Sequence, residues 1–319
     1  PELRKNAGAY YTPVEVVLAQ VRLIDDLLTS RLGKRLGFAD PGVVTLDPAA
    51  GTGTYLLAVI DHAMTKVYDQ HGKGAVPAKA TALAGNLYGF ELMVGPFAVS
   101  ELRVTRALKD WGAHLAANGT HVYLTDTLES PHAIAPPLPM YLKPISDQHA
   151  KALKVKANVP VIVCLGNPPY DRHEAADGTN QARTGHWVRW GDDGKGLAAI
   201  LNDFTEPAKK AGHGGDLKNA YNLYVYFWRW ALWKVFESKT AAGPGIVSFI
   251  SASSYLDGDA FCGMREHMRR QCDEIWILDL GGEGRGTRKS DNVFAIQTPV
   301  AIAVAFRPGK VKKDAPASV

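Results

Sequence analysis

The sequence has few cysteines and no long hydrophobic run, and both absences narrow the class of protein. Three cysteines occur among 319 residues, with no C-x-x-C pair, which argues against a disulfide framework or a zinc site and favours a reducing, cytoplasmic location. No segment approaches the ~18 consecutive apolar residues of a membrane span. The first residues, PELRKNAGAYYTP, lack a signal-peptide apolar core and a starting methionine, so we expect a processed chain or a piece of a longer one.

Composition and charge are those of an ordinary globular protein. The chain is 46% hydrophobic and 21% charged, with a net charge of +4. A mildly basic chain permits a nucleic-acid partner without requiring one, because many enzymes carry such a charge. The length suffices for one large domain or two small ones.

Strand-like apolar segments alternate with helical patterns along the chain. Buried strands are predicted at 43–48, 86–92, 121–126, 159–166, 245–251, 274–281 and 298–306, and helices at 54–68, 95–111 and 221–236. This alternation predicts an α/β fold with a mostly parallel sheet and helices on both faces. Ligands of such folds bind at the carboxyl ends of the strands, where Asp47, Glu91, Asp126 and Asn167 fall.

A glycine-rich turn, DPAAGTGTYLL at 47–57, follows the first strand and opens a helix. Gly51 and Gly53 allow a tight turn and a close approach to a ligand. Leu56 breaks the dinucleotide pattern G-x-G-x-x-G, and no segment has the spacing of a P-loop. By itself the turn also fits a plain strand-to-helix connection. Glu91 is a candidate to accept ribose hydroxyls, and Asp126 either accepts an exocyclic amine or caps a turn.

Two prolines stop the strand at 159–166. The sequence Asn167-Pro168-Pro169-Tyr170 forms a rigid turn that exposes one amide and one aromatic ring, since proline cannot donate to a sheet. Taken alone, this turn is a stiff loop or a site for a planar nitrogen.

Six segments in order resemble the N6-adenine DNA methyltransferases, with the motif order of the gamma subgroup. They are GAYYTP (8–13), DPAAGTG (47–53), GFEL (89–92), LTDTL (124–128), GNPPY (166–170) and NVF (292–294). The stretch at 280–304 further resembles the methyltransferase part of the single-chain Type ISP restriction-modification enzymes. The resemblance implies a Rossmann-like fold that uses S-adenosylmethionine (SAM) and methylates N6 of a flipped-out adenine at specific DNA sites.

The resemblance also implies a set of cofactor-binding residues. The YYTP segment and the glycine turn would hold the methionine part of SAM, Glu91 its ribose and Asp126 its adenine amine. The full set is Tyr11, Thr12, Pro13, Asp47, Pro48, Ala49, Gly51, Gly53, Glu91, Leu92, Asp126 and Thr127.

The catalytic residues implied by the resemblance are Asn167, Pro168, Pro169 and Tyr170. The Asn167 side-chain oxygen and the Pro168 carbonyl would accept the two N6 hydrogens. Tyr170 and Phe294 would stack on the extruded base, although Phe294 also fits a core position. No metal is implied, and HEAAD at 173–177 is not the H-E-x-x-H zinc motif.

Double-stranded DNA is the implied partner. Basic residues near the motifs would meet its phosphates, although each alone also fits a solvated surface charge. They are Arg172, Arg183, Arg189, Lys195, Arg285, Arg288 and Lys289. Nuclease, ATPase and target-recognition parts would lie elsewhere in a longer restriction-modification chain.

We expect one catalytic domain at 1–306. It would include an N-terminal helical segment at 1–33 and two loop insertions at 130–158 and 171–219, followed by a linker or tail at 307–319. Two other functions stay open from the residues alone. One is methylation of RNA adenine or protein glutamine, and the other is a catalytically silent DNA-binding module.

Overall fold

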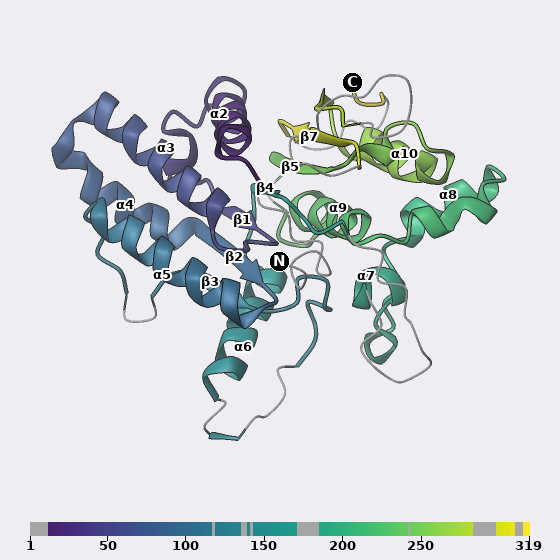
Figure 1. Ribbon diagram of the computed structural model, residues 1–319, viewed down its shortest axis with the longest axis horizontal. Helices are drawn as coiled ribbons and strands as arrows, with labels where there is room; N and C mark the ends of the chain where they lie inside the picture. The colour runs from purple at the N-terminus through teal and green to yellow at the C-terminus, as the bar shows by residue number, and fades with distance from the viewer. Residues whose placement is uncertain are drawn as a thin grey trace.

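The alternating strands assemble into one central sheet. The structure is a computed structural model that describes residues 12–116, 119–134, 139–140, 143–170, 185–241, 243–282, 298–309 and 315–319. Within these ranges seven strands pair in the order β3-β2-β1-β4-β5-β7-β6 (Figure 1). Their bounds are β1 Thr45–Asp47, β2 Leu87–Glu91, β3 His121–Leu124, β4 Val163–Gly166, β5 Gly245–Ala252, β6 Glu274–Asp279 and β7 Val300–Arg307.

The sheet is parallel except for one strand. β7 runs antiparallel to both of its neighbours, β5 and β6, whereas β1 to β5 pair in parallel. The predicted α/β fold with a mostly parallel sheet is therefore confirmed.

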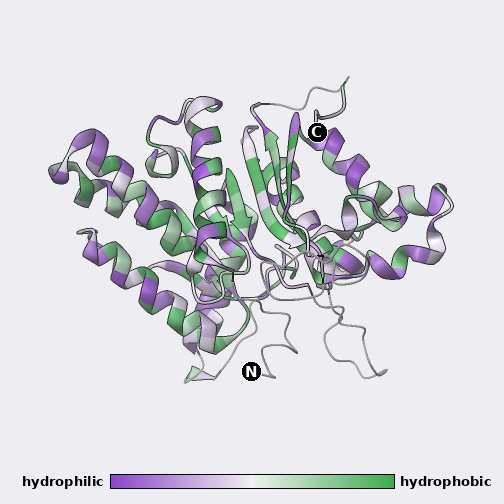
Figure 2. Ribbon diagram, turned by 45° about the horizontal axis from the view of Figure 1, so that its top comes forward, coloured by the Kyte–Doolittle hydropathy of each residue, from purple (hydrophilic) through white to green (hydrophobic). Residues whose placement is uncertain are grey.

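Helices cover both faces of this sheet. Figures 1 and 2 show one group of helices on each side of the central strands. One group is α2 Val14–Ser30, α3 Thr54–His71, α4 Val76–Asn86 and α5 Val94–Asp110. The other is α6 Lys143–Asn158, α7 His186–Trp190, α8 Asn202–Lys210, α9 Leu223–Leu232 and α10 Cys262–Gln271.

The buried residues of β5 show how the sheet separates two cores. Ile246 and Ile250 belong to the core shared with α2 to α5, whereas Val247 and Phe249 belong to the core shared with α6 to α10. This alternation follows from the two-residue period of a strand, and it explains why the strand is apolar throughout.

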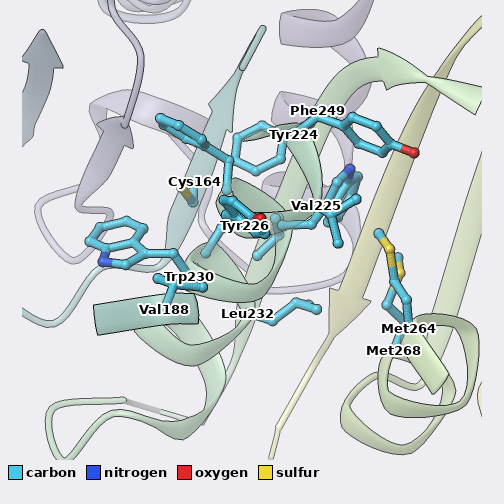
Figure 3. Packing of buried hydrophobic residues seen from close by; sticks show 14 of the residues in the cluster. Cys164, Val188, Tyr224, Val225, Tyr226, Trp230, Leu232, Phe249, Met264 and Met268 are labelled. Atoms are coloured by element: carbon cyan, nitrogen blue, oxygen red, sulfur yellow. The ribbon is translucent and has the colours of Figure 1, made fainter. Parts of the chain in front are cut away.

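The second core is rich in aromatic side chains from α9. Figure 3 shows Tyr224, Tyr226 and Trp230 of this helix among Phe249 and the methionines of α10. α9 is buried on all sides, since every residue from Tyr224 to Leu232 is buried, the charged Arg229 included. The helix expected at 221–236 is confirmed, and its last turn, Trp233–Glu237, is a π-helix.

The two expected loop insertions contain helices. The 16-residue α6 lies within 130–158, and α7 and α8 lie within 171–219. The apolar period of α6 is hidden because one of its core positions is Lys156, which is fully buried. Pro207 inside α8 hides that helix in the same way, since proline usually ends a helix.

The last described residues, within the expected linker or tail at 307–319, pair with the start of β6. Ser318 accepts a hydrogen bond from the Ile275 backbone at 2.8 Å and donates one to the Asp273 carbonyl at 2.9 Å. Ala317 is buried beside them. Residues 315–319 therefore dock against the start of β6. Among the described residues, no helix is both long and apolar enough to cross a membrane.

The turn from β1 into α3 depends on a glycine. Gly53 has a φ of +85°, which side chains rarely adopt, and a Cβ there would lie 2.7 Å from Ser100 Oγ. α3 begins at the next residue, so the turn sets the direction of this helix.

Replacing Gly53 by Ala should therefore destabilise the fold. We expect Gly53→Ala to lower the free energy of unfolding by about 1–3 kcal/mol, measured by urea denaturation. Gly74→Ala is the matched control, because its Cβ would meet no atom within 4 Å. Equal stability of the two variants would contradict this account of the turn.

Candidate active site

Four polar residues lie at the carboxyl ends of adjacent parallel strands. Asp47 ends β1 and Glu91 ends β2, while Asp126 lies two residues after β3 and Asn167 directly after β4. Because β1 pairs with both β2 and β4, and β2 with β3, these ends meet at one edge of the sheet. The structure thus brings the four predicted residues to one side of the molecule.

Asp47 is buried beside the backbone that leads to Asn167. Only 1% of Asp47 is exposed, and its carboxylate accepts the Ala49 N–H at 3.0 Å. A Cβ on Gly166 would lie 2.7 Å from Asp47 Oδ1, so only glycine fits there. Burial raises the pKa of Asp47 to about 7, the Ala49 N–H opposes this, and the negative charge of Glu91 adds to it.

Glu91 ties two loops together. One carboxylate oxygen accepts the Gly51 N–H and the other accepts the Met93 N–H, both at 2.8 Å. Burial raises the pKa of Glu91, and the backbone N–H groups partly offset that effect. Each carboxylate oxygen keeps a second lone pair, so the side chain can still accept a hydroxyl. Gly51 has a φ of +54°, and a Cβ there would meet no atom within 4 Å, which leaves open space beside the carboxylate.

Asp126 has a partner that the sequence analysis missed. His186 Nε2 lies 3.1 Å from one Asp126 oxygen, and the Leu128 N–H donates to the other at 2.8 Å. Burial alone would raise the pKa of Asp126, but His186 and the other donors lower it overall. In turn, the hydrogen bond to Asp126 raises the pKa of His186. Sixty residues separate the pair, so no local pattern reveals it.

The Asn167 amide is held on both sides. Its nitrogen donates to Thr12 Oγ1 at 2.9 Å, and the Tyr170 hydroxyl donates to its oxygen at 2.7 Å. Thr12 is thus in contact with Asn167, whereas the resemblance had given it only a cofactor-binding role. Pro13 caps α2, since its carbonyl accepts the N–H groups of Val16 and Val17.

A large cavity opens beside Tyr170. Its volume is about 1020 Å³, which exceeds the usual size of a small-molecule site. Tyr170, Tyr224 and Phe261 supply aromatic walls, and Asn222 and Asp257 supply polar groups. The cavity can therefore hold a planar aromatic ring next to the Asn167 turn.

The structure also places the other described residues that were predicted to bind the cofactor or DNA. The Pro48 carbonyl accepts the Thr127 hydroxyl, which links the glycine turn to the loop after β3. Leu92, which follows Glu91, is 65% exposed. The Arg189 guanidinium lies over the rings of Trp190 and Tyr221, at 4.6 and 4.4 Å. Lys195 is exposed at a second cavity of about 540 Å³ that His186 also lines.

Several predicted residues lie outside the described ranges. They are Tyr11, Arg172, Arg183, Arg285, Arg288, Lys289 and Phe294.

One group of metal-ligand residues has another explanation. Asp203, Glu237 and His267 lie within ligand distance of one another. The Arg229 guanidinium donates to both carboxylates, and His267 lies 2.9 Å from Glu237. The arginine already supplies the positive charge that the carboxylates need. The cluster is therefore an ion-pair network rather than a metal centre.

The Asp126–His186 pair predicts a pH-dependent stability. The pKa of His186 is raised in the folded protein, so the pair contributes fully below about pH 6.5, the ordinary histidine pKa. The contribution disappears as pH rises through the raised value. We expect His186→Gln to cost about 0.5–1 kcal/mol at pH 5.5 and less at pH 9, by urea denaturation.

The exposed His114 offers a control for this measurement. His114→Gln removes a surface histidine outside the pair and so gives the effect of losing an imidazole as such at both pH values. A cost of His186→Gln that is larger at pH 9 than at pH 5.5 would contradict the assignment of the pair.

Comparison with solved structures supports the fold. The chain matches the ATP-dependent Type ISP restriction-modification enzyme LlaBIII bound to DNA, with a TM-score of 0.75 and 24% identity over 97% of this chain and 19% of that chain. A nuclease-deletion mutant of the Type ISP enzyme LlaGI, in complex with a DNA substrate mimic, matches with a TM-score of 0.73 and 21% identity over 97% of this chain and 23% of that chain. The DrdV–DNA complex matches with a TM-score of 0.71 and 24% identity over 97% of this chain and 27% of that chain.

The chain therefore spans about a fifth to a quarter of the length of these structures. No curated protein sequence matches it. A family model described as N-6 DNA Methylase matches residues 1–199, which is more than half of the chain. The glycine turn, the acid after the next strand and the Asn167-Pro168-Pro169-Tyr170 turn all lie in this part, and the chain belongs to the N-6 DNA methylase family.

Proposed function

We propose that this chain transfers a methyl group from SAM to N6 of an adenine in DNA, with the base turned out of the duplex. Family membership supports the reaction. The single observation that carries the proposal for this chain is the Asn167 amide, which two hydrogen bonds hold at the end of β4 beside a large cavity.

The residues at the strand ends suit SAM. Glu91 presents carboxylate oxygens to ribose hydroxyls, and the open space at Gly51 accommodates a ligand close to the backbone. An adenine ring would cover the exposed side chain of Leu92, with Asp126 within reach of its amine. Asp47 lies near the proposed methionine part. When bound, SAM supplies an electrophilic methyl group.

The Asn167 turn supplies the other half of the chemistry. Adenine N6 is a weak nucleophile because its lone pair is delocalised into the ring. The Asn167 oxygen and the Pro168 carbonyl would accept hydrogen bonds from the two N6 hydrogens, which would localise the N6 lone pair and orient it for attack. Alignment of two reacting groups can lower a barrier by about 7–11 kcal/mol at most. The two prolines keep the turn rigid, so the alignment is set before the substrate binds.

An adenine inside a duplex cannot reach this turn. Extruding it costs a few kcal/mol, and stacking on an aromatic side chain returns about 1–3 kcal/mol. The aromatic walls of the cavity beside Tyr170 suit such stacking. Tyr170 also donates to Asn167, so it both orients the amide and lines the space for the base.

We also infer a role within a restriction-modification enzyme. The three structural matches are far longer than this chain, and two are described as Type ISP restriction-modification enzymes. Target recognition and DNA cleavage would then belong to other parts of a longer protein. The choice of DNA site is assigned to those parts, while the described residues supply methyl transfer.

Asn167→Ala tests the reaction directly. We expect it to reduce methyl transfer to adenine in DNA by about 100-fold or more, because the aligned acceptor for N6 is lost. The measurement is incorporation of tritiated methyl into DNA, with RNA and protein substrates assayed in parallel. Asn202→Ala, an exposed position at the start of α8, is the control. Wild-type activity in Asn167→Ala, or labelling of RNA or protein but not DNA, would refute the proposal.

Glu91→Gln tests the cofactor site. A hydrogen bond to a charged group is worth about 1.5–3 kcal/mol, so we expect the Kd for SAM to rise about 10- to 100-fold. Titration calorimetry measures this change without any DNA. Glu206→Gln on the exposed face of α8 should leave the Kd unchanged. An unaltered Kd in Glu91→Gln would remove this residue from the cofactor site.

A further inference from the structure

A buried glutamine begins a chain of hydrogen bonds that leads to the active site. Gln20 on α2 is 1% exposed, and its amide nitrogen donates to the Ser248 carbonyl at 2.9 Å and the Ser248 hydroxyl at 2.8 Å. The Tyr55 phenol on α3 donates to the Gln20 amide oxygen at 2.9 Å. Three elements of the first core, α2, α3 and β5, are thus joined by polar groups.

The chain of hydrogen bonds continues from Tyr55 to Asn167. The Thr12 hydroxyl lies beside the Tyr55 phenol and opposes the effect of burial, which raises the pKa of that phenol; it also accepts a hydrogen bond from the Asn167 amide nitrogen at 2.9 Å. Tyr170 then donates to the Asn167 oxygen at 2.7 Å and lies 3.3 Å from the Ile250 carbonyl. The path therefore leaves β5 at Ser248 and returns to β5 two residues later.

The start of this path constrains the groups that follow. The Ser248 carbonyl can only accept, so Gln20 must turn its nitrogen toward β5 and its oxygen toward Tyr55. Tyr55 donates its one hydrogen to that oxygen, so toward the neighbouring Thr12 hydroxyl it can only accept. A Thr12 hydroxyl that turns its hydrogen toward Tyr55 can only accept from Asn167, as it does.

The last step orients the catalytic amide. Asn167 meets Thr12 with its nitrogen, so its oxygen faces the opposite way, toward Tyr170. In the reversed orientation the amide would point N–H groups at the N6 hydrogens of adenine, and donor would face donor. A wrongly turned amide therefore opposes the alignment that methyl transfer needs.

We propose that Gln20 and Tyr55 are positioning residues that fix the orientation of the Asn167 amide through Thr12. The inference rests on the proposed function, because it assigns Asn167 the role of accepting the N6 hydrogens. Neither Gln20 nor Tyr55 is in the set of cofactor or base contacts derived above. Their side chains act on the reaction only through the path of hydrogen bonds.

A purely structural role is the competing explanation. The same hydrogen bonds tie α2 and α3 to β5, so their loss also affects stability. The two roles differ in what they change. A structural role lowers the fraction of folded enzyme, whereas a positioning role lowers kcat of the folded enzyme.

Tyr55→Phe and Gln20→Leu are the test variants. Each removes polar atoms from the path and keeps an apolar side chain of similar size. We expect kcat for DNA adenine methylation to fall about 10- to 100-fold, with KM for SAM within about twofold, after correction for the folded fraction by circular dichroism. The double variant should be no slower than the slower single variant, because both act on one path.

Tyr123→Phe is the matched control. Its phenol lies 2.7 Å from His121 Nδ1, on β3 and outside the path. It should lose a comparable hydrogen bond and keep kcat within about twofold of wild type. Wild-type kcat in Tyr55→Phe, losses in Tyr55→Phe and Gln20→Leu that multiply in the double variant, or a loss explained by the unfolded fraction would each overturn the proposal.

A second measurement does not depend on activity. In protein labelled with ¹⁵N-asparagine, the Asn167 side-chain amide signals can be assigned by their absence in Asn167→Ser. We expect them to shift and exchange faster with solvent in Tyr55→Phe but not in Tyr123→Phe. Unchanged signals would overturn the orienting role even if the wild-type protein methylated no DNA. Absent methylation with shifted signals would instead count against the proposed function alone.

Discussion

Parallel pairing of β1 with both β2 and β4 is the constraint on which the site depends. Parallel strands end at the same edge, so residues far apart in the sequence arrive side by side. Asp47 and Asn167 are 120 residues apart, yet a Cβ on the intervening Gly166 would touch the Asp47 carboxylate. A change in strand order would separate these groups even if every side chain were kept.

The two cores on either side of the sheet adjoin different parts of the proposed site. The core with α2 to α5 lies behind the glycine turn and contains Tyr55, which donates to the buried Gln20 and belongs to the path proposed to orient Asn167. The core with α6 to α10 contains Tyr224 and Phe261, which also form walls of the large cavity. The Asn167 turn follows β4, the strand at the centre of the sheet. It therefore lies between the proposed cofactor side and the proposed base side.

The strands and their polar ends could be predicted from the sequence because apolar runs and glycine turns are local signals. The helix α6 could not, since a buried Lys156 interrupts its apolar pattern and is stabilised by the distant Asp126 carbonyl. His186 and Gln20 were missed for a related reason. Their partners lie 60 and 228 residues away, so their burial depends on tertiary contacts that no short motif encodes.

Backbone strain is stored where α7 begins. His186 has a φ of +36°, a region that non-glycine residues avoid at a cost of about 1–3 kcal/mol, and its ring lies against Asp126. The same carboxylate is the proposed acceptor for the adenine amine of SAM. The proposed ligand and His186 would therefore both hydrogen-bond to the Asp126 carboxylate. A ligand that hydrogen-bonds to this carboxylate would therefore change the strength of the Asp126–His186 contact at the start of α7. By linkage, that contact would change the affinity for the ligand by the same factor.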